Sequence, residues 1–164
     1  MGIAESENPI IDATTWKLIF GFVVGVAIIG LIGPPLSLEI RPLDARFFYT
    51  GAEASAYLEQ IGPAGRSAYL RAETVDFGLI LIYTTLIARL FVRRFGRQAL
   101  CAIAFVPGLF DLIETAGAFS VVWQGKSEAP AYLGYATALK WISTFLVLGI
   151  LALSRFRKVR YGTR

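Results

Sequence analysis

The fold of this chain is decided by residues 99–123, which read ALCAIAFVPGLFDLIETAGAFSVVW. The run is long enough to cross a membrane core of about 30 Å as a helix, which takes about 20 residues. Two acids, Asp111 and Glu114, stand in its middle. A carboxylate at the centre of a bilayer costs about 2.5–3.5 kcal/mol on the insertion scale, so acids at this depth usually mark a site. Being three residues apart, these two share one face of the helix.

Three further runs are long and apolar enough to cross a membrane, and the four predicted spans are residues 16–36, 74–94, 99–123 and 131–154. Hydrophobic residues make up 55% of the 164 residues, and the mean hydropathy is +0.59. These values are typical of an integral membrane protein rather than a soluble domain. The sequence therefore predicts a single all-α domain over residues 1–164, a bundle of four transmembrane helices in the lipid bilayer.

The loop between the first two spans, residues 37–73, is too patterned to be a linker. Thr50 and Glu53 form a capping-box pattern, which predicts a short helix that ends near Ile61. Gly62 and Pro63 break that helix, and Pro63 suits the first turn of a following helix that can run into the second span. We expect a short helical cap over the outer end of the bundle, with a lid that gates access of a ligand as the alternative.

Basic residues predict the orientation in the membrane. Nine Lys and Arg residues fall on the side of the two termini and five on the side of the 37–73 loop. Because cytoplasmic segments carry the excess of positive charge, both termini are predicted to be cytoplasmic. The expected location is the bacterial inner membrane, as a multi-pass protein.

The residues that are missing exclude several classes of site. The chain has no histidine and one cysteine, Cys101. It therefore lacks the ligands of His-bound haem and of the usual zinc sites, any His general base, and an internal disulfide. The arginines flank the spans and form no basic stripe, so we expect no nucleic-acid partner. No metal site or cofactor is predicted.

Charged residues in different spans are predicted to lie at matching depths. With a rise of about 1.5 Å per residue and the centre of the third span near Phe110, Asp111 falls at the midplane. Glu114 lies roughly 6 Å outward from that centre, and Lys140 of the fourth span about 4–5 Å outward from its own span centre. Lys140 is thus the expected partner of both acids, because a buried charge without a partner would shift its pKa and become neutral. Two interpretations stay open: an ion network that fixes helix register, or a site that handles protons or orients a ligand.

The candidate acid–base cluster is therefore Asp111, Glu114 and Lys140, since one lysine facing several acids leaves one acid able to donate a proton. Candidate ligand-binding residues are Asp76 and Tyr83, which share a face of the second span, and Trp141. Room for a ligand beside the acids is expected from small or kinked positions of the third span, namely Pro107, Gly108, Gly117 and Ala118.

The first span carries Gly21 and Gly25, four residues apart. Small residues at this spacing let two helix backbones approach closely. This face is expected to pack on another helix, which belongs either to the same chain or to a membrane protein partner or second copy.

The chain resembles a family of small four-span bacterial membrane proteins for which no activity is known. The resemblance covers most of the chain after Ser37 and rests on residues 49–58 (YTGAEASAYL), 62–70 (GPAGRSAYL), 110–114 (FDLIE) and 139–141 (LKW). In the family pattern an asparagine follows the glutamate, whereas here Thr115 stands there. The resemblance implies a four-helix membrane fold and no particular activity. A looser likeness, in chemistry only, is to membrane enzymes that isomerise sterols or terpenoids with buried carboxylates.

Two classes of function fit these features. The first is a polar pocket in the outer half of the bundle that binds or converts a hydrophobic small molecule, such as a lipid or isoprenoid. The second is a non-catalytic accessory or assembly subunit of a larger membrane complex. No catalytic motif is present, so the sequence leaves open whether the protein is an enzyme.

Overall fold

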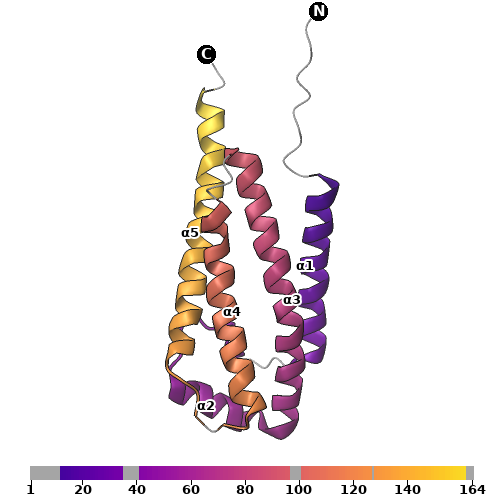
Figure 1. Cartoon of the computed structure of the whole chain (residues 1–164), viewed down its shortest axis with the longest axis vertical. Coiled ribbons are helices and arrows are strands. Elements are labelled where there is room, and N and C mark those ends of the chain that lie inside the picture. Colours follow the sequence, from indigo (N-terminus) through magenta and orange to yellow (C-terminus); the bar gives the residue numbers. More distant parts are fainter. Residues whose placement is uncertain (1–11, 35–40, 97–100, 127, 162–164) are drawn as a thin grey trace, which may run out of the picture.

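The structure, a computed structural model, describes residues 12–34, 41–96, 101–126 and 128–161. Its regular elements over these ranges are all α-helices (Figure 1): α1 (Ala13–Ile32), α2 (Gly51–Gln60), α3 (Gly62–Phe95), α4 (Cys101–Trp123) and α5 (Tyr132–Tyr161). Four of them, all except α2, are long and apolar enough to cross a membrane. The predicted four-helix transmembrane bundle with a helical cap is confirmed, and the protein is a multi-pass membrane protein.

The helices follow one another around the bundle in chain order. Helix α1 packs against α3, α3 against α4, and α4 against α5, whereas α3 and α5 touch only briefly. Helix α2 lies across one end, and α1 begins and α5 ends at the opposite end (Figure 1). The main neighbour of α1 is therefore α3, which leaves the rest of its surface to its surroundings.

The glycine face of α1 is used inside the chain. A Cβ atom at Gly25 would overlap the side chain of Leu79 in α3, and one at Gly21 would lie 3.6 Å from Ile82. The sequence left open whether this face packs on a helix of the same chain or on a partner. In the structure it packs on α3 of the same chain.

The cap begins with the predicted capping box. The Thr50 backbone N–H donates to the Glu53 carboxylate at 2.7 Å, and the Glu53 N–H donates to the Thr50 hydroxyl at 3.2 Å. These hydrogen bonds lower the pKa of Glu53. At the other end of α2, Gly62 has a φ of 61°, a backbone conformation that favours glycine, and Pro63 follows in the first turn of α3. As predicted, the loop helix after Gly62 continues into the second span as one helix of 34 residues.

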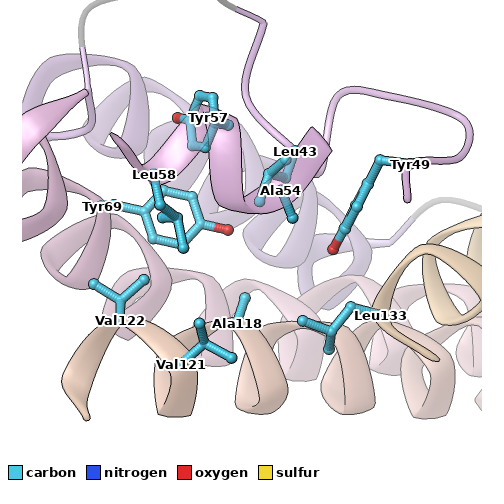
Figure 2. Close-up of a cluster of buried hydrophobic side chains, with 10 residues drawn as sticks. All are labelled: Leu43, Tyr49, Ala54, Tyr57, Leu58, Tyr69, Ala118, Val121, Val122 and Leu133. Carbon is cyan, nitrogen blue, oxygen red and sulfur yellow. The ribbon is translucent and has the colours of Figure 1, made fainter. Parts of the chain in front are cut away.

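A buried apolar cluster joins the cap to the nearby ends of α3, α4 and α5 (Figure 2). Tyr57 and Tyr69 pack edge to face at its centre, with ring centroids 6.0 Å apart. The cluster comprises Leu43, Tyr49, Ala54, Tyr57, Leu58, Tyr69, Ala118, Val121, Val122 and Leu133. The segment before α2 and α2 itself are therefore part of the folded core.

The opposite end of the bundle is held by a second apolar cluster and by ion pairs. The cluster is formed by Ile87, Phe91, Ala104 and Val147. Asp12 caps α1 by accepting a hydrogen bond from the Thr15 N–H at 2.9 Å, and Arg89 of α3 lies 2.6 Å from the same carboxylate. These contacts hold the pKa of Asp12 well below its usual value. The end of α1 is thereby fixed to α3.

The C-terminal ends of two helices lie several residues from the predicted ends of their spans. Helix α1 ends at Ile32 rather than at residue 36, because Gly33 is extended (ψ 176°) and donates its N–H to the Ile29 carbonyl. A residue that precedes a proline is driven out of helical geometry, and Pro34 follows directly. Helix α5 continues to Tyr161, beyond residue 154, since no glycine or proline stops it where the apolar stretch ends. The predicted end at Leu36 lies outside the described residues.

Candidate functional site: a buried lysine between two carboxylates

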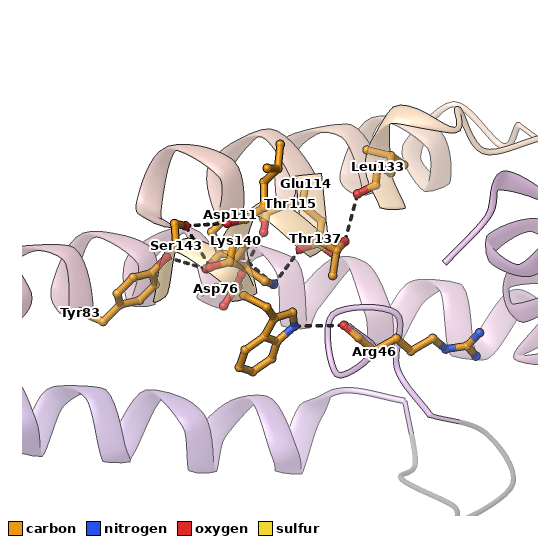
Figure 3. Close-up of polar contacts among 12 residues, drawn as sticks. Arg46, Asp76, Tyr83, Asp111, Glu114, Thr115, Leu133, Thr137, Lys140 and Ser143 are labelled. Atoms are coloured by element: carbon orange, nitrogen blue, oxygen red, sulfur yellow. Dashed lines mark hydrogen bonds and ion pairs between the residues drawn. The ribbon is translucent and has the colours of Figure 1, made fainter. Parts of the chain in front are cut away.

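Lys140 of α5 lies between the two acids of α4 (Figure 3). Its Nζ atom is 2.7 Å from Glu114 Oε2 and 3.1 Å from Asp111 Oδ1. The predicted pairing is confirmed, and it follows from the depths: the acids are one turn apart on α4, and the lysine enters level with them. Such a buried ion pair is tolerated only when the remaining oxygen lone pairs are also satisfied.

Hydroxyl groups from three other positions satisfy those oxygens. Tyr83 of α3 donates to Asp111 Oδ2 at 2.8 Å, and Thr137 of α5 donates to Glu114 Oε1 at 2.5 Å. The Tyr49 hydroxyl, from the segment before α2, donates to the same Glu114 oxygen at 3.3 Å. Burial raises the pKa of Tyr49, so its phenol stays a neutral donor. The ion pair is thus held by α3, α4, α5 and the cap together.

Asp76 belongs to the outer rim of this cluster. It accepts a hydrogen bond of 2.9 Å from the Thr115 hydroxyl and is only half-buried. The Thr115 hydroxyl is thus the donor that meets the Asp76 carboxylate. In the described part of the chain, the ion pairs of Lys140 are with Asp111 and Glu114 and not with Asp76.

Trp141, a predicted ligand-binding residue, binds the protein's own backbone. Its indole N–H donates to the Arg46 carbonyl at 3.0 Å, and its ring stacks on Phe145 with centroids 5.8 Å apart. It therefore anchors the segment Arg41–Tyr49, which we call the strap, against α5.

Sequence reasoning missed Tyr49, Thr137 and Glu73 as members of the site. Glu73 is 7% exposed and lies close to Tyr69, although its place just before the predicted span resembles a surface position. Thr137 could have been found, because it lies three residues before Lys140 and so shares its face of α5. Tyr49 carried no such signal, since its contact with Glu114 joins residues 65 positions apart.

The expected room beside the acids, at the small positions of α4, is absent. A Cβ at Gly108 would overlap the Thr84 side chain, one at Gly117 would overlap Leu133, and Ala118 is only 4% exposed. Pro107 is fully buried as well. Small residues here let neighbouring helices come close instead of leaving a void. This expectation was therefore wrong for that face of α4.

The charged cluster is not fully enclosed, because several of its side chains keep some exposed surface. The side chains of Lys140 and Asp111 keep 11% and 10% of their surface exposed, while Glu114 keeps 4%. Of the cluster's side chains, Asp76 and Tyr83 are half-buried. Among the residues that the structure describes, no group of three or more acidic or cysteine side chains could hold a metal ion. The arrangement offers charged and hydroxyl groups to a ligand that arrives beside Asp76.

Protein-family models, curated proteins and solved structures were all compared with the chain, and none of them matches it.

Proposed function

We propose that the protein binds a hydrophobic, lipid- or isoprenoid-like small molecule whose polar group reaches the Lys140 cluster. The observation that carries this proposal is the exposed surface that Lys140 and Asp111 retain within apolar spans. Ionisable groups at this depth are costly to bury, and they mark functional sites by default.

The cluster is also suited to acid–base chemistry on such a ligand. One ammonium faces the carboxylates of Asp111 and Glu114, with Asp76 close by. Unequal surroundings are the usual means of separating the acid and base roles of two carboxyl groups. In this scheme Asp111 and Glu114 exchange protons with the ligand, Lys140 sets their charge state, and Asp76 and Tyr83 orient it.

Passage of ions across the membrane is a weaker reading. Below the cluster, α3, α4 and α5 meet in the apolar contacts of Ile87, Phe91, Ala104 and Val147. A conducting path needs polar groups or water along its whole length. The cluster can therefore be reached from the α2 end of the bundle, and the apolar contacts separate it from the other end.

We place the protein in the bacterial inner membrane with both termini in the cytoplasm and α2 outside. In a Cys101→Ala background, single cysteines at Ser55 and Thr163 are expected to react with an impermeant thiol reagent from opposite sides of the membrane. Ser55 should react in intact cells, and Thr163 only in inverted vesicles. Reaction of both positions from one side would contradict the four-span topology.

Ligand binding is tested by purifying the protein in a mild detergent and identifying bound small molecules by mass spectrometry. Re-adding such a molecule at 100 times its Kd should stabilise the fold by about 2.7 kcal/mol. Glu114→Ala, provided that it folds, should lose both the bound molecule and the stabilisation. Ser143→Ala is the matched control, because among the described residues its hydroxyl bonds to carbonyls of its own helix, of Leu139 at 2.6 Å and of Lys140 at 3.1 Å.

The competing proposal, an accessory subunit, makes the opposite prediction. The purified protein would then carry no small molecule and would bring down defined membrane partners whether or not Glu114 is present. Because Gly21 and Gly25 pack on α3, leucine at these positions would disturb the bundle itself. A partner contact is better tested on the outward face of α1, where Phe20 and Leu31 are 71% and 84% exposed. Partners that depend on this face, found without any ligand, would refute the binding proposal.

A further inference from the structure

The strap runs down the side of α5 instead of over its end. Its Tyr49 carbonyl sits so close to Gly134 that a Cβ there would overlap it, and Phe48 packs on Tyr135 with centroids 5.4 Å apart. Further along, the Arg46 carbonyl accepts the Trp141 indole hydrogen bond. Trp141 is nine residues into α5, about 13 Å along the helix axis at 1.5 Å per residue. The strap therefore enters the bundle to nearly the depth of Lys140, as the loop beside Arg46 in Figure 3 illustrates.

Irregular backbone at this depth needs a special environment. In a membrane it is tolerated only where it is buried in protein or lines a water-filled space. The strap is not buried throughout: it turns at Leu43–Arg46, closed by a 3.0 Å hydrogen bond, and Asp44 and Ala45 at the tip of this turn are exposed. An exposed carboxylate facing hydrocarbon would carry the same cost of insertion as the acids of α4. Water is the surrounding that fits both observations.

The groups that face this space are mainly acidic. Asp44 lies within electrostatic reach of Lys140 and Asp111, and half-buried Asp76 lies within reach of Asp44. Two of the nearby positive groups are already engaged. Lys140 pairs with two carboxylates, and the Arg46 guanidinium bonds to the Arg41 carbonyl at 3.0 Å and stands over the Tyr57 ring at 5.8 Å.

We infer that the strap, α3 and α5 enclose a water-filled vestibule that opens at the α2 end and stops at the Lys140–Asp111 ion pair. Its acidic wall admits a cationic or hydrogen-bond-donating polar group, such as an amine or an alcohol, and repels an anionic one. This inference rests on the proposed function and narrows its ligand to amphiphiles without a phosphate or carboxylate head. The apolar cluster at Phe91 closes the other end.

The test measures the rate at which single cysteines react in a Cys101→Ala background, in lipid nanodiscs that leave both faces accessible. The reagents are two impermeant methanethiosulfonates, one with a trimethylammonium group and one with a sulfonate. The vestibule position is Ala45→Cys. Ile142→Cys is the matched control, since it is 45% exposed at a similar depth on α5, and Ala52→Cys on exposed α2 gives the rate in open water.

Ala45→Cys is expected to react with the cationic reagent at a rate within about tenfold of Ala52→Cys, because the thiolate needs water. Ile142→Cys should react about 100-fold more slowly, since a charged group at that depth faces hydrocarbon. At Ala45→Cys, the ratio of the rate with the cationic reagent to the rate with the sulfonate should be about ten, after division by the same ratio at Ala52→Cys. Adding Asp44→Asn and Asp76→Asn should bring that ratio close to one.

Two results would overturn the inference. If the thiol of Ala45→Cys reacted as slowly as that of Ile142→Cys, the strap would have no water beside it. The second result concerns the normalised ratio of the cationic to the sulfonate rate at Ala45→Cys. If this ratio were below one, or if it did not change when Asp44→Asn and Asp76→Asn are added, the wall would not be acidic. Neither result depends on finding a bound ligand, so a failure of the vestibule is distinguishable from a failure of the proposed function.

Discussion

Replacing Lys140 by methionine is expected to destabilise the protein by about 3–5 kcal/mol, the cost of breaking a buried ion pair by removing one partner. Methionine has nearly the volume of lysine and fits an apolar helix, so the loss comes from the carboxylates of Asp111 and Glu114, which would be left buried without a cation. The measurement is the free energy of unfolding of purified protein in mixed micelles of increasing SDS content.

The same experiment identifies the cause through a second substitution. Adding Glu114→Gln to Lys140→Met removes one unpaired charge and should recover part of the lost stability. Ser143→Ala, a polar deletion one turn away on the same helix, should change stability by less than about 0.5 kcal/mol. If Lys140→Met and Glu114→Gln were strictly additive, the two residues would not interact.

The second large effect is expected at Gly134, where alanine has no room. Its Cβ would overlap the backbone carbonyl of Tyr49, and backbone cannot move aside as a flexible side chain can. We expect a loss of about 1–3 kcal/mol, as for overfilling a packed core, together with displacement of the strap. Tyr49 would then withdraw from Glu114, and Arg46 from Trp141.

Displacement of the strap can be followed by the fluorescence of Trp141 in a Trp16→Phe, Trp123→Phe background. Gly134→Ala should shift its emission to longer wavelength, because the indole loses its backbone partner and meets water. Gly149→Ala is the matched control on the same helix: no atom lies within 4 Å of its added Cβ, and alanine favours a helix over glycine by about 1 kcal/mol. Equal behaviour of the two variants would contradict the packing of the strap on α5.

Most of the secondary structure was predictable because it depends on local rules. Four apolar runs longer than the membrane core must be helices, since only a helix satisfies its own backbone in hydrocarbon. The capping box at Thr50 and the break at Gly62 and Pro63 are likewise local, and both were confirmed. The pairing of Lys140 with Asp111 and Glu114 was predictable as well, because depth in a membrane follows from position along a helix.

Other features depended on which helices meet. The small residues Gly108 and Gly117 suggested a cavity, but the sequence cannot say whether the space beside a glycine stays empty or admits Thr84 and Leu133. Trp141 was predicted as a ligand-binding residue, and nothing in the sequence indicated that its indole also bonds to the strap. In each case the deciding neighbour comes from another helix or from the loop.

What the sequence by itself determined is the number of membrane-crossing helices, the helical cap and the charged residues that must find partners inside the bundle. These follow from the cost of exposing backbone and charge to hydrocarbon, which acts on every residue independently of the rest of the fold. Only the tertiary structure decided that Tyr49 enters from the outer loop to bind Glu114, and that the strap passes beside α5 at the depth of the ion pair. Contacts of this kind join residues far apart in the chain, and their geometry is set by the packing of α3, α4 and α5 rather than by any local pattern.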